Sequence, residues 1–330
     1  MKTRTKHTQR SADREKHEKR SVSVSGPTEI AGDFRCGYVA IVGEPNVGKS
    51  TLLNAFLQQK ISIVTRKPQT TRQQVLGILT TDAMQAVFLD TPGLLEPKYL
   101  LHEAMVQSAH RALEDADVVL VLSDVTKQSD LPAMAAEHLS AAAGKPLLLC
   151  LNKVDKVPPQ SLLPVIDRWS KSGLFKEIIP VSAIKSINVP ELLKVIARYL
   201  PEHPPFYPPD IVSEQPERFF VAEMIRERIF ERYHDEIPYS TAVEITEFKE
   251  RETGKTFISA DIIVERDSQK GILIGKGGLA LKNISQRSRI VIEKFIGKPV
   301  YLELHVKVGE EWRGKESWIQ RLGYRARGTT

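Results

Sequence analysis

Residues 43–50 read Gly-Glu-Pro-Asn-Val-Gly-Lys-Ser and fit the phosphate-binding pattern G-x-x-x-x-G-K-[ST]. Glycines in such a turn let backbone N–H groups approach phosphate oxygens, and the N-terminus of the following helix adds a positive dipole. We predict that Lys49 contacts the β- and γ-phosphates of a nucleotide as a point charge and that the Ser50 hydroxyl binds Mg²⁺. The predicted phosphate-binding residues are Gly43, Glu44, Pro45, Asn46, Val47, Gly48, Lys49, Ser50 and Thr51.

Two further segments are typical of a site that distinguishes a triphosphate from a diphosphate. Asp90 to Gly93 reads Asp-Thr-Pro-Gly after a predicted strand, and we expect Asp90 to hold Mg²⁺ through water and the Gly93 N–H to contact the γ-phosphate. In the polar loop 67–72, a threonine would bind Mg²⁺ only when the nucleotide is a triphosphate. We favour Thr71 for this role, with Thr70 as the alternative; an ordinary polar loop is the plainer interpretation. The predicted catalytic residues are Lys49, Thr71 and Gly93, the metal ligands are Ser50, Thr71 and Asp90, and Thr70, Asp90, Thr91, Pro92 and Gly93 join the nucleotide site.

The segment Asn152-Lys153-Val154-Asp155 follows an apolar strand and predicts the choice of base. The Asp155 carboxylate can accept hydrogen bonds from guanine N1–H and the 2-amino group, which adenine cannot offer, and readout of this kind discriminates strongly. We expect the Lys153 stem to lie along the base and Asn152 to tie the loop to its neighbours. A backbone N–H of Ser182-Ala183, after the last strand, is expected to contact guanine O6.

Two residues bear on the rate of hydrolysis. Leu94 stands directly after Gly93, where signalling GTPases carry a glutamine that orients water. Leucine cannot hydrogen-bond water, so we expect hydrolysis to be slow or the water to be placed by other means. The amide oxygen of Asn46 is a candidate ligand for a monovalent cation, which makes K⁺ a second candidate cofactor beside Mg²⁺.

A second glycine cluster, Gly275-Lys276-Gly277-Gly278, contains the pattern G-x-x-G between two predicted helices. Glycines there let the backbone close on sugar-phosphate, which is how K-homology domains clamp about four nucleotides of a single strand. A solvated basic helix after a structural turn is the plainer interpretation. Trp312 and Trp318 either stack on bases or pack in the core, and we favour the core. The predicted RNA-binding residues are Gly275, Lys276, Gly277, Gly278, Lys282, Arg287 and Arg289.

The elements that position these residues fall into two groups. Short apolar strands alternate with helices up to residue 200, which predicts an α/β domain with a mostly parallel sheet covered by helices on both faces. Its helices are expected near residues 51–58, 130–143, 160–171 and 189–200. Prolines crowd residues 201–216, and beyond them the order α-β-β-α-α-β predicts an α+β domain. We therefore divide the chain into a disordered basic tail (1–34), a nucleotide-binding domain (35–200), a linker (201–216) and an RNA-binding domain (217–330).

Composition narrows the setting. The chain has 330 residues, a formal charge of +6 and a pI near 9.1, which is compatible with a phosphate-rich partner. No apolar run reaches the ~20 residues of a membrane span, and no signal-peptide core is expected. Cys36 and Cys150 stand in or beside apolar runs and are predicted to be buried free thiols, which suits the cytoplasm.

The set of motifs, with Pro-Gln-Thr-Thr-Arg before Asp-Thr-Pro-Gly and a C-terminal K-homology pattern, resembles the Era family of bacterial GTPases over residues 35–325. This resemblance implies a P-loop GTPase domain followed by a type II K-homology (KH) domain. It also implies GTP and GDP as ligands, binding to the 3′ end of small-subunit ribosomal RNA, assistance to 30S assembly, and peripheral association with the inner face of the cell membrane as an alternative location. We expect the protein to be a monomer.

Two other classes of function are weighed against this one. The C-terminal domain could dock on a protein or a membrane, and salt-dependent binding of single-stranded RNA would argue against that. An RNA-modifying enzyme ranks lowest, because the sequence shows no cofactor motif and no Cys or His cluster suited to that chemistry.

Overall fold

The computed structural model describes residues 33–65, 67–93, 96–127, 142–251 and 254–324. Most of the basic tail, Leu94 and nearly all of the helix expected at 130–143 lie outside the described residues. The domain limits given above remain a proposal.

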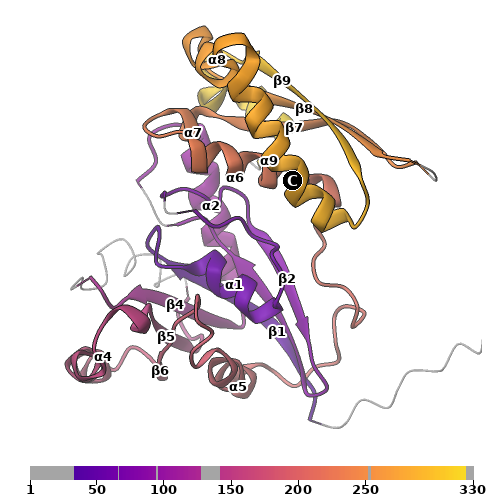
Figure 1. Ribbon diagram of the computed structural model, residues 1–330. Coiled ribbons are helices and arrows are strands. Elements are labelled where there is room, and N and C mark those ends of the chain that lie inside the picture. Colours follow the sequence, from indigo (N-terminus) through magenta and orange to yellow (C-terminus); the bar gives the residue numbers. More distant parts are fainter. Residues whose placement is uncertain (1–32, 66, 94–95, 128–141, 252–253, 325–330) are drawn as a thin grey trace, which may run out of the picture.

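The first half of the chain forms a six-stranded sheet in the order β2-β3-β1-β4-β5-β6 (Figure 1). Only β2 runs antiparallel to its neighbour β3, and the other pairs are parallel. The mostly parallel sheet predicted from the alternating pattern is therefore confirmed. The strands are β1 (Arg35–Gly43), β2 (Val75–Thr80), β3 (Met84–Asp90), β4 (Val118–Asp124), β5 (Leu147–Asn152) and β6 (Glu177–Pro180).

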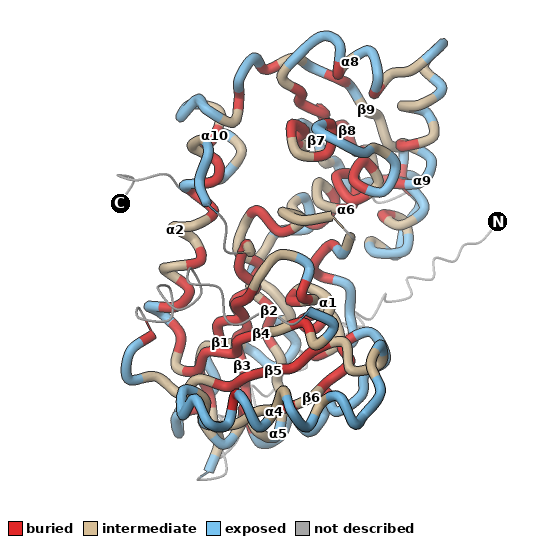
Figure 2. The backbone as a smooth tube through the Cα atoms, turned by 90° about the vertical axis from the view of Figure 1, so that its left-hand side faces the viewer, coloured by how far each residue is buried: buried red, intermediate tan, exposed pale blue. Residues whose placement is uncertain are grey.

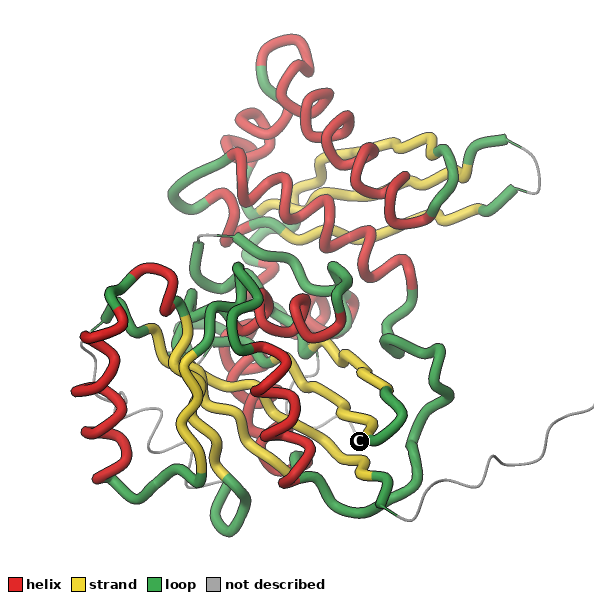
Figure 3. Tube along the Cα trace, turned by 60° about the horizontal axis from the view of Figure 1, so that its bottom comes forward, coloured by secondary structure: helices red, strands yellow, loops and turns green. Residues whose placement is uncertain are grey.

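Helices cover both faces of this sheet because successive residues of a strand point to opposite sides. Val39 and Ile41 of β1 pack in one core with residues of α1 and α5, whereas Ala40 and Val42 pack in another with residues of α2 and α4. Figure 3 shows helices on either side of the strands, and Figure 2 shows the strands as the buried layer. The helices are α1 (Lys49–Leu57), α2 (Leu100–Asp115), α4 (Leu162–Lys171) and α5 (Val189–Tyr199), with short 3₁₀ turns at Val154–Lys156 and Pro159–Ser161.

Helix α2 is an element that the sequence analysis missed. It contributes Ala112 and Leu113 to the core under β1 and β4, and its first turns place Leu101 and Met105 against the C-terminal domain. The other predicted elements within the described residues are present, with ends that differ by a few residues at most.

The C-terminal part forms a three-stranded sheet, β7-β8-β9, in which β8 is antiparallel to β7 and parallel to β9. Ile258, Ala260 and Ile262 of β8 share a core with apolar residues of α6 and α9. The predicted order α-β-β-α-α-β is present as α6, β7, β8, α8, α9 and β9, and the short helices α7 and α10 were not predicted. The elements are α6 (Glu217–Arg232), α7 (Ile237–Ser240), β7 (Ala242–Lys249), β8 (Thr256–Val264), α8 (Asp267–Ile274), a 3₁₀ turn (Lys276–Gly278), α9 (Leu279–Ile296), β9 (Val300–Val308), a 3₁₀ turn (Trp312–Gly314) and α10 (Glu316–Arg321).

Trp312 joins the two domains. Its ring is fully buried with Leu101 and Met105 of α2 and Ile319 of α10, and its Nε1–H donates to the Ser240 carbonyl at 2.8 Å. Core packing, the alternative favoured from the sequence, is therefore the role of Trp312, and it is not available to stack on a base.

The proline-rich segment 201–216 lies against the first domain. Cys36 N–H donates to the Pro201 carbonyl at 3.0 Å, and Ile78 N–H of β2 donates to the Val212 carbonyl at 2.8 Å. The Ser213 hydroxyl donates to the Leu76 carbonyl. The connection between the domains therefore follows the surface of the first domain past β2. Cys36 and Cys150 are both buried and free, as predicted.

Candidate functional site

The predicted phosphate loop lies between the end of β1 and the start of α1. Gly48 has a φ of 106°, and a Cβ added there would stand 2.3 Å from Nδ2 of Asn152. A side chain at this position would therefore clash with the segment Asn152 to Asp155, which we call the base loop. Lys49 is buried, and its Nζ donates to the carbonyls of Gly43 and Glu44 at 3.0 Å each. Burial lowers the pKa of Lys49 to about 8 although Asp90 and Glu44 oppose the shift. The phosphate loop thus holds the ammonium group of Lys49 at the N-terminus of α1, where phosphate binding is favoured.

Three predicted metal ligands meet beside the phosphate loop. The Ser50 hydroxyl donates to Asp90 Oδ2 at 2.8 Å and lies 2.8 Å from the Thr71 hydroxyl. Adjacent oxygens around an octahedral Mg²⁺ stand about 3 Å apart, because each Mg–O distance is ~2.1 Å. The spacing of the Ser50 and Thr71 hydroxyls therefore fits two ligands of one Mg²⁺, and the Asp90 carboxylate stands beside them, where it is expected to hold the ion through water.

Asp90 itself supports this fit. Its carboxylate is fully buried, Oδ2 also accepts the Ser62 hydroxyl at 3.1 Å, and Oδ1 has no hydrogen-bond partner among the described residues. Burial raises the pKa of Asp90, with Lys49 and the neighbouring hydroxyls opposing. A buried carboxylate oxygen without a partner is costly unless a cation or water completes it.

The two threonine alternatives differ in direction. The Thr70 hydroxyl donates to the Lys67 carbonyl at 2.8 Å and lies 2.8 Å from the Thr65 hydroxyl, so it turns back into its own loop. The Thr71 hydroxyl instead contacts Ser50. The geometry therefore favours Thr71 over Thr70 as the ligand.

The base loop is built around Asn152. Its Nδ2 donates to the Val47 carbonyl at 2.7 Å, and its Oδ1 accepts the N–H groups of Lys153 at 2.8 Å and Ala183 at 3.0 Å. The Asp155 carboxylate accepts the Ser182 hydroxyl at 2.6 Å. These bonds join the phosphate loop to both predicted base-reading segments.

Asp124, at the end of β4, is a site residue that the sequence analysis did not name. Its carboxylate accepts Lys153 Nζ at 2.6 Å, and the same Nζ donates to the Asn46 carbonyl at 2.6 Å. Although burial opposes ionisation, hydrogen bonds from Lys153 and Thr126 hold the pKa of Asp124 below its usual value. Its position could have identified it as a site residue, because Asp124 ends β4 beside Asn152, which ends the neighbouring strand β5.

A cavity of about 680 Å³ opens over these residues. This volume lies within the range of small-molecule sites. The phosphate loop, the loop with Thr71, and the base loop each form one side of it. Its lining includes Pro45, Asn46, Gly48, Lys49, Ser50, Thr51, Thr70, Thr71, Gly93 and Lys153, together with Lys156 and Ile184.

The second glycine cluster lies in the other domain, between α8 and α9. A Cβ added at Gly275 would stand 2.6 Å from Cβ of Ala280, but none of the described atoms lies within 4 Å of one added at Gly277 or Gly278. Gly277 has a φ of 59°. The backbone of these two glycines is therefore open to a ligand. The neighbouring side chains of Lys276, Lys282, Arg287 and Arg289 are all exposed.

Comparison with known proteins finds two family models, which match two separate parts of this chain. The model of a "50S ribosome-binding GTPase" family matches residues 38–153, and the KH domain model matches residues 236–313. GTPase Era of Clostridium botulinum is 44% identical over 292 residues, which cover 88% of this chain and 99% of the relative. The chain belongs to the Era family. It is therefore a GTPase that carries a KH domain.

Two solved Era structures share the fold over the same extent, 88% of this chain and 99% of theirs, at 42% identity. Era of Aquifex aeolicus, bound to GDP and AlF4⁻, has a TM-score of 0.85. A complex of Era with Mg²⁺, the GTP analogue GDPNP and nucleotides 1506–1542 of 16S ribosomal RNA has a TM-score of 0.84. Mg²⁺ is thus the cation that accompanies the nucleotide in an Era relative. Within the described part of this chain, no helix is both long and apolar enough to cross a membrane.

Proposed function

We propose that this Era-family chain binds GTP with Mg²⁺ in the cavity over the phosphate loop and hydrolyses it to GDP and phosphate. The observation that carries the proposal is the cluster of Ser50, Thr71 and Asp90. The Ser50 hydroxyl lies 2.8 Å from the Thr71 hydroxyl, as two ligands of one Mg²⁺ would, and 2.8 Å from Oδ2 of Asp90, the carboxylate expected to hold the ion through water. Bound there, Mg²⁺ would neutralise charge that develops on the phosphate oxygens.

The chain's own groups supply the remaining steps. Lys49, the N-terminus of α1 and the phosphate-loop N–H groups hold the triphosphate, and the Asp155 carboxylate accepts guanine N1–H and the 2-amino group. Water attacks the γ-phosphorus while the bond from that atom to the bridging oxygen breaks, so that GDP leaves with the bond's electron pair. Preorganised charges of this kind carry most of the catalysis in phosphoryl transfer.

We further propose K⁺ as a second cation. Asn46 lines the cavity beside Lys49 and Ser50, and its carbonyl accepts Lys153 Nζ at 2.6 Å, which fixes the loop at this residue. An amide oxygen at this place would bind a monovalent cation next to the phosphates and supply positive charge.

For the C-terminal domain we propose binding to the 3′ region of small-subunit ribosomal RNA and, through it, a role in 30S assembly. The open backbone of Gly277 and Gly278 and the exposed basic side chains around it support this proposal, and so does the RNA held by the related Era complex. We place the protein in the cytoplasm as a monomer. Sedimentation with anionic vesicles would distinguish this location from peripheral attachment to the inner face of the membrane.

Charge reversal at the glycine loop tests the RNA proposal. Lys276→Asp replaces an attractive charge without changing the backbone, so we expect weaker binding of a 16S 3′-end oligonucleotide and a salt slope lower by about 1. Lys315→Asp makes the same change at an exposed site on the start of α10 and serves as the control. GTP affinity without RNA should stay at the parent value in both. Equal RNA affinity and salt slope in Lys276→Asp and the parent would contradict the RNA site.

A further inference from the structure

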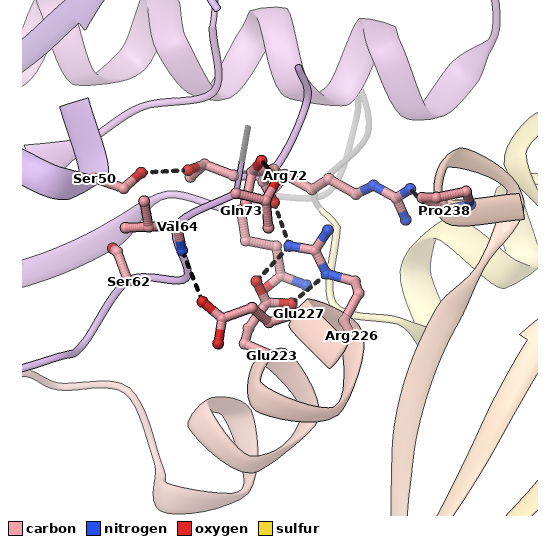
Figure 4. Close-up of polar contacts among 12 residues, drawn as sticks. Ser50, Ser62, Val64, Arg72, Gln73, Glu223, Arg226, Glu227 and Pro238 are labelled. Carbon is pink, nitrogen blue, oxygen red and sulfur yellow. Dashed lines mark hydrogen bonds and ion pairs between the residues drawn. The ribbon is translucent and has the colours of Figure 1, made fainter. Parts of the chain in front are cut away.

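The loop that carries Thr71 is held by the C-terminal domain, as Figure 4 shows. Arg226 of α6 is 2% exposed, and its guanidinium donates to the Thr70 carbonyl and to the Glu223 carboxylate. Thr70 immediately precedes Thr71, whose hydroxyl lies 2.8 Å from that of Ser50. One side chain of α6, in the C-terminal part of the chain, therefore fixes the peptide that joins the two threonines.

The residue on the other side of Thr71 is held as well. Arg72 is 3% exposed and donates to the carbonyls of Pro238 at 3.0 Å, Tyr239 at 2.8 Å and Thr241 at 2.7 Å. Arg226 and Arg72 thus attach the backbone on both sides of Thr71 to the segment from α6 to the start of β7.

Two more side chains, Glu227 and Lys67, extend this attachment along the loop. The Glu227 carboxylate, 1% exposed, accepts Val64 N–H at 3.0 Å and Lys60 Nζ at 2.6 Å. Lys67 Nζ donates to the carbonyls of Phe230 and Tyr233 at the end of α6. The loop is therefore bonded to α6 at several points between residues 60 and 70.

The chemistry of these contacts makes them restrictive. A buried guanidinium whose acceptor moves away is left without compensation for its lost hydration, which is strongly unfavourable. Nη1 of Arg226 has no partner among the described residues. The acceptors of the guanidinium are therefore Glu223, for Nε and Nη2, and the Thr70 carbonyl, for Nη2. A displacement of the Thr70 peptide therefore requires α6 to follow or the charge to be exposed.

We propose that Arg226, held by Glu223, is a positioning residue for the GTP-bound site: it fixes the Thr70 carbonyl and so presents the Thr71 hydroxyl to Mg²⁺. The preference for GTP over GDP is then set in part by a residue of α6, outside the nucleotide-binding domain. This inference rests on the proposed role of Thr71 and deepens it.

The test measures the ratio of the Kd values for GDP and for GDPNP, each with Mg²⁺, in the full-length protein. Arg226→Gln should lower the preference for GDPNP by about 10-fold or more, the size expected for one charged hydrogen bond. Glu223→Gln, which leaves the guanidinium in place, should lower it less. Arg313→Gln is the matched control, because Arg313 also bonds across the domains, to the Tyr99 hydroxyl at 3.1 Å, but does not contact the loop of Thr71.

Thr71→Ala, alone and combined with Arg226→Gln, separates the proposed role of Thr71 from the proposed role of Arg226. If Thr71→Ala leaves the ratio unchanged, the proposed role of Thr71 fails, and the inference fails with it. If Thr71→Ala lowers the ratio but Arg226→Gln does not, only the inference is overturned. Equal losses in Arg226→Gln and Arg313→Gln would mean general loosening of the domains and would also overturn it. Support requires that Arg226→Gln adds nothing in the Thr71→Ala background, as coupled residues behave. Should Arg226→Gln not fold, Glu223→Gln is held to the same comparisons.

Discussion

Replacing Asp155 by asparagine exchanges one oxygen for an amino group in the base loop and tests the guanine reader directly. The Ser182 hydroxyl donates to Asp155 Oδ1 at 2.6 Å and can donate equally to the amide oxygen of asparagine. That bond would turn Nδ2 of the variant toward the base, where guanine presents only donors. Two charge-assisted hydrogen bonds are lost at about 1.5–3 kcal/mol each, or about 3–6 kcal/mol together. GTP affinity should therefore fall roughly 10²- to 10⁴-fold.

The same geometry predicts a gain for another base. Xanthine carries an oxygen in place of the 2-amino group and can accept from Nδ2, so xanthosine triphosphate should bind the variant better than GTP does. Isothermal titration calorimetry with each nucleotide measures both affinities in the parent and in the variant. Asp167→Asn, at an exposed acid of α4 paired with Lys171, is the control for the loss of one negative charge. Unchanged GTP affinity in Asp155→Asn would refute the assignment of the base reader.

Three further outcomes are expected. Single-turnover GTP hydrolysis should be slow and faster in K⁺ than in Na⁺, and Asn46→Ala should lose the difference with a rate about 10²-fold lower in K⁺; equal rates of the parent in both salts would remove the cation. His102, whose ring lies 3.1 Å from Gln69 Oε1 and accepts Lys98 N–H, has its pKa lowered to about 4 by burial and by nearby cations. The stability that neutral His102 provides is present above pH 6.5 and is lost as the pH falls toward 4. Between pH 7.5 and 5, the free energy of unfolding of His102→Gln should therefore fall by about 2 kcal/mol less than that of the parent. Equal falls in urea titrations of the two proteins would contradict this. Finally, RNA affinity should differ between the GTP- and GDP-bound states by about 1–3 kcal/mol, and RNA must shift the preference for GTP by the same factor; titrations in which neither ligand affects the other would exclude the coupling.

The sequence was sufficient for the fold and for the grouping of the phosphate, metal and base residues because their spacing fixes local geometry. Ser50 stands at the start of α1 and Asp90 at the end of β3, and in a parallel sheet such positions meet at one edge. Spacing could not decide between the adjacent residues Thr70 and Thr71, and the preference for Thr71 agrees with the direction of each hydroxyl.

Helix α2 was missed although its buried residues, from Leu101 to Leu113, recur at helical spacing. Its exposed positions carry charged and polar side chains, so the helical spacing of its apolar residues is less evident than in the more apolar segments around it. That omission was one of interpretation, because the periodicity is present in the sequence.

The domain contacts could not have been read from local patterns. Thr70 and Arg226 are 156 residues apart, and Arg72 and Thr241 are 169 apart. Whether a charged residue such as Arg226 or Glu227 is solvated or buried depends on how two folded units dock. Arginine and glutamate on a helix are exposed in most proteins, so burial of both was contrary to expectation.

The course of the interdomain segment protects the first domain. Strand β2 lies at the edge of the six-stranded sheet, and an open edge offers unpaired N–H and C=O groups to any other strand, which is a common route to aggregation. Because Ile78 N–H is bonded to the Val212 carbonyl and the Leu76 carbonyl to Ser213, the segment occupies part of that edge. A fragment cut at residue 200 would uncover it, whereas one that extends past Ser213 would keep it covered. The interdomain segment therefore connects the domains and also makes part of the β2 edge unavailable for pairing with another strand.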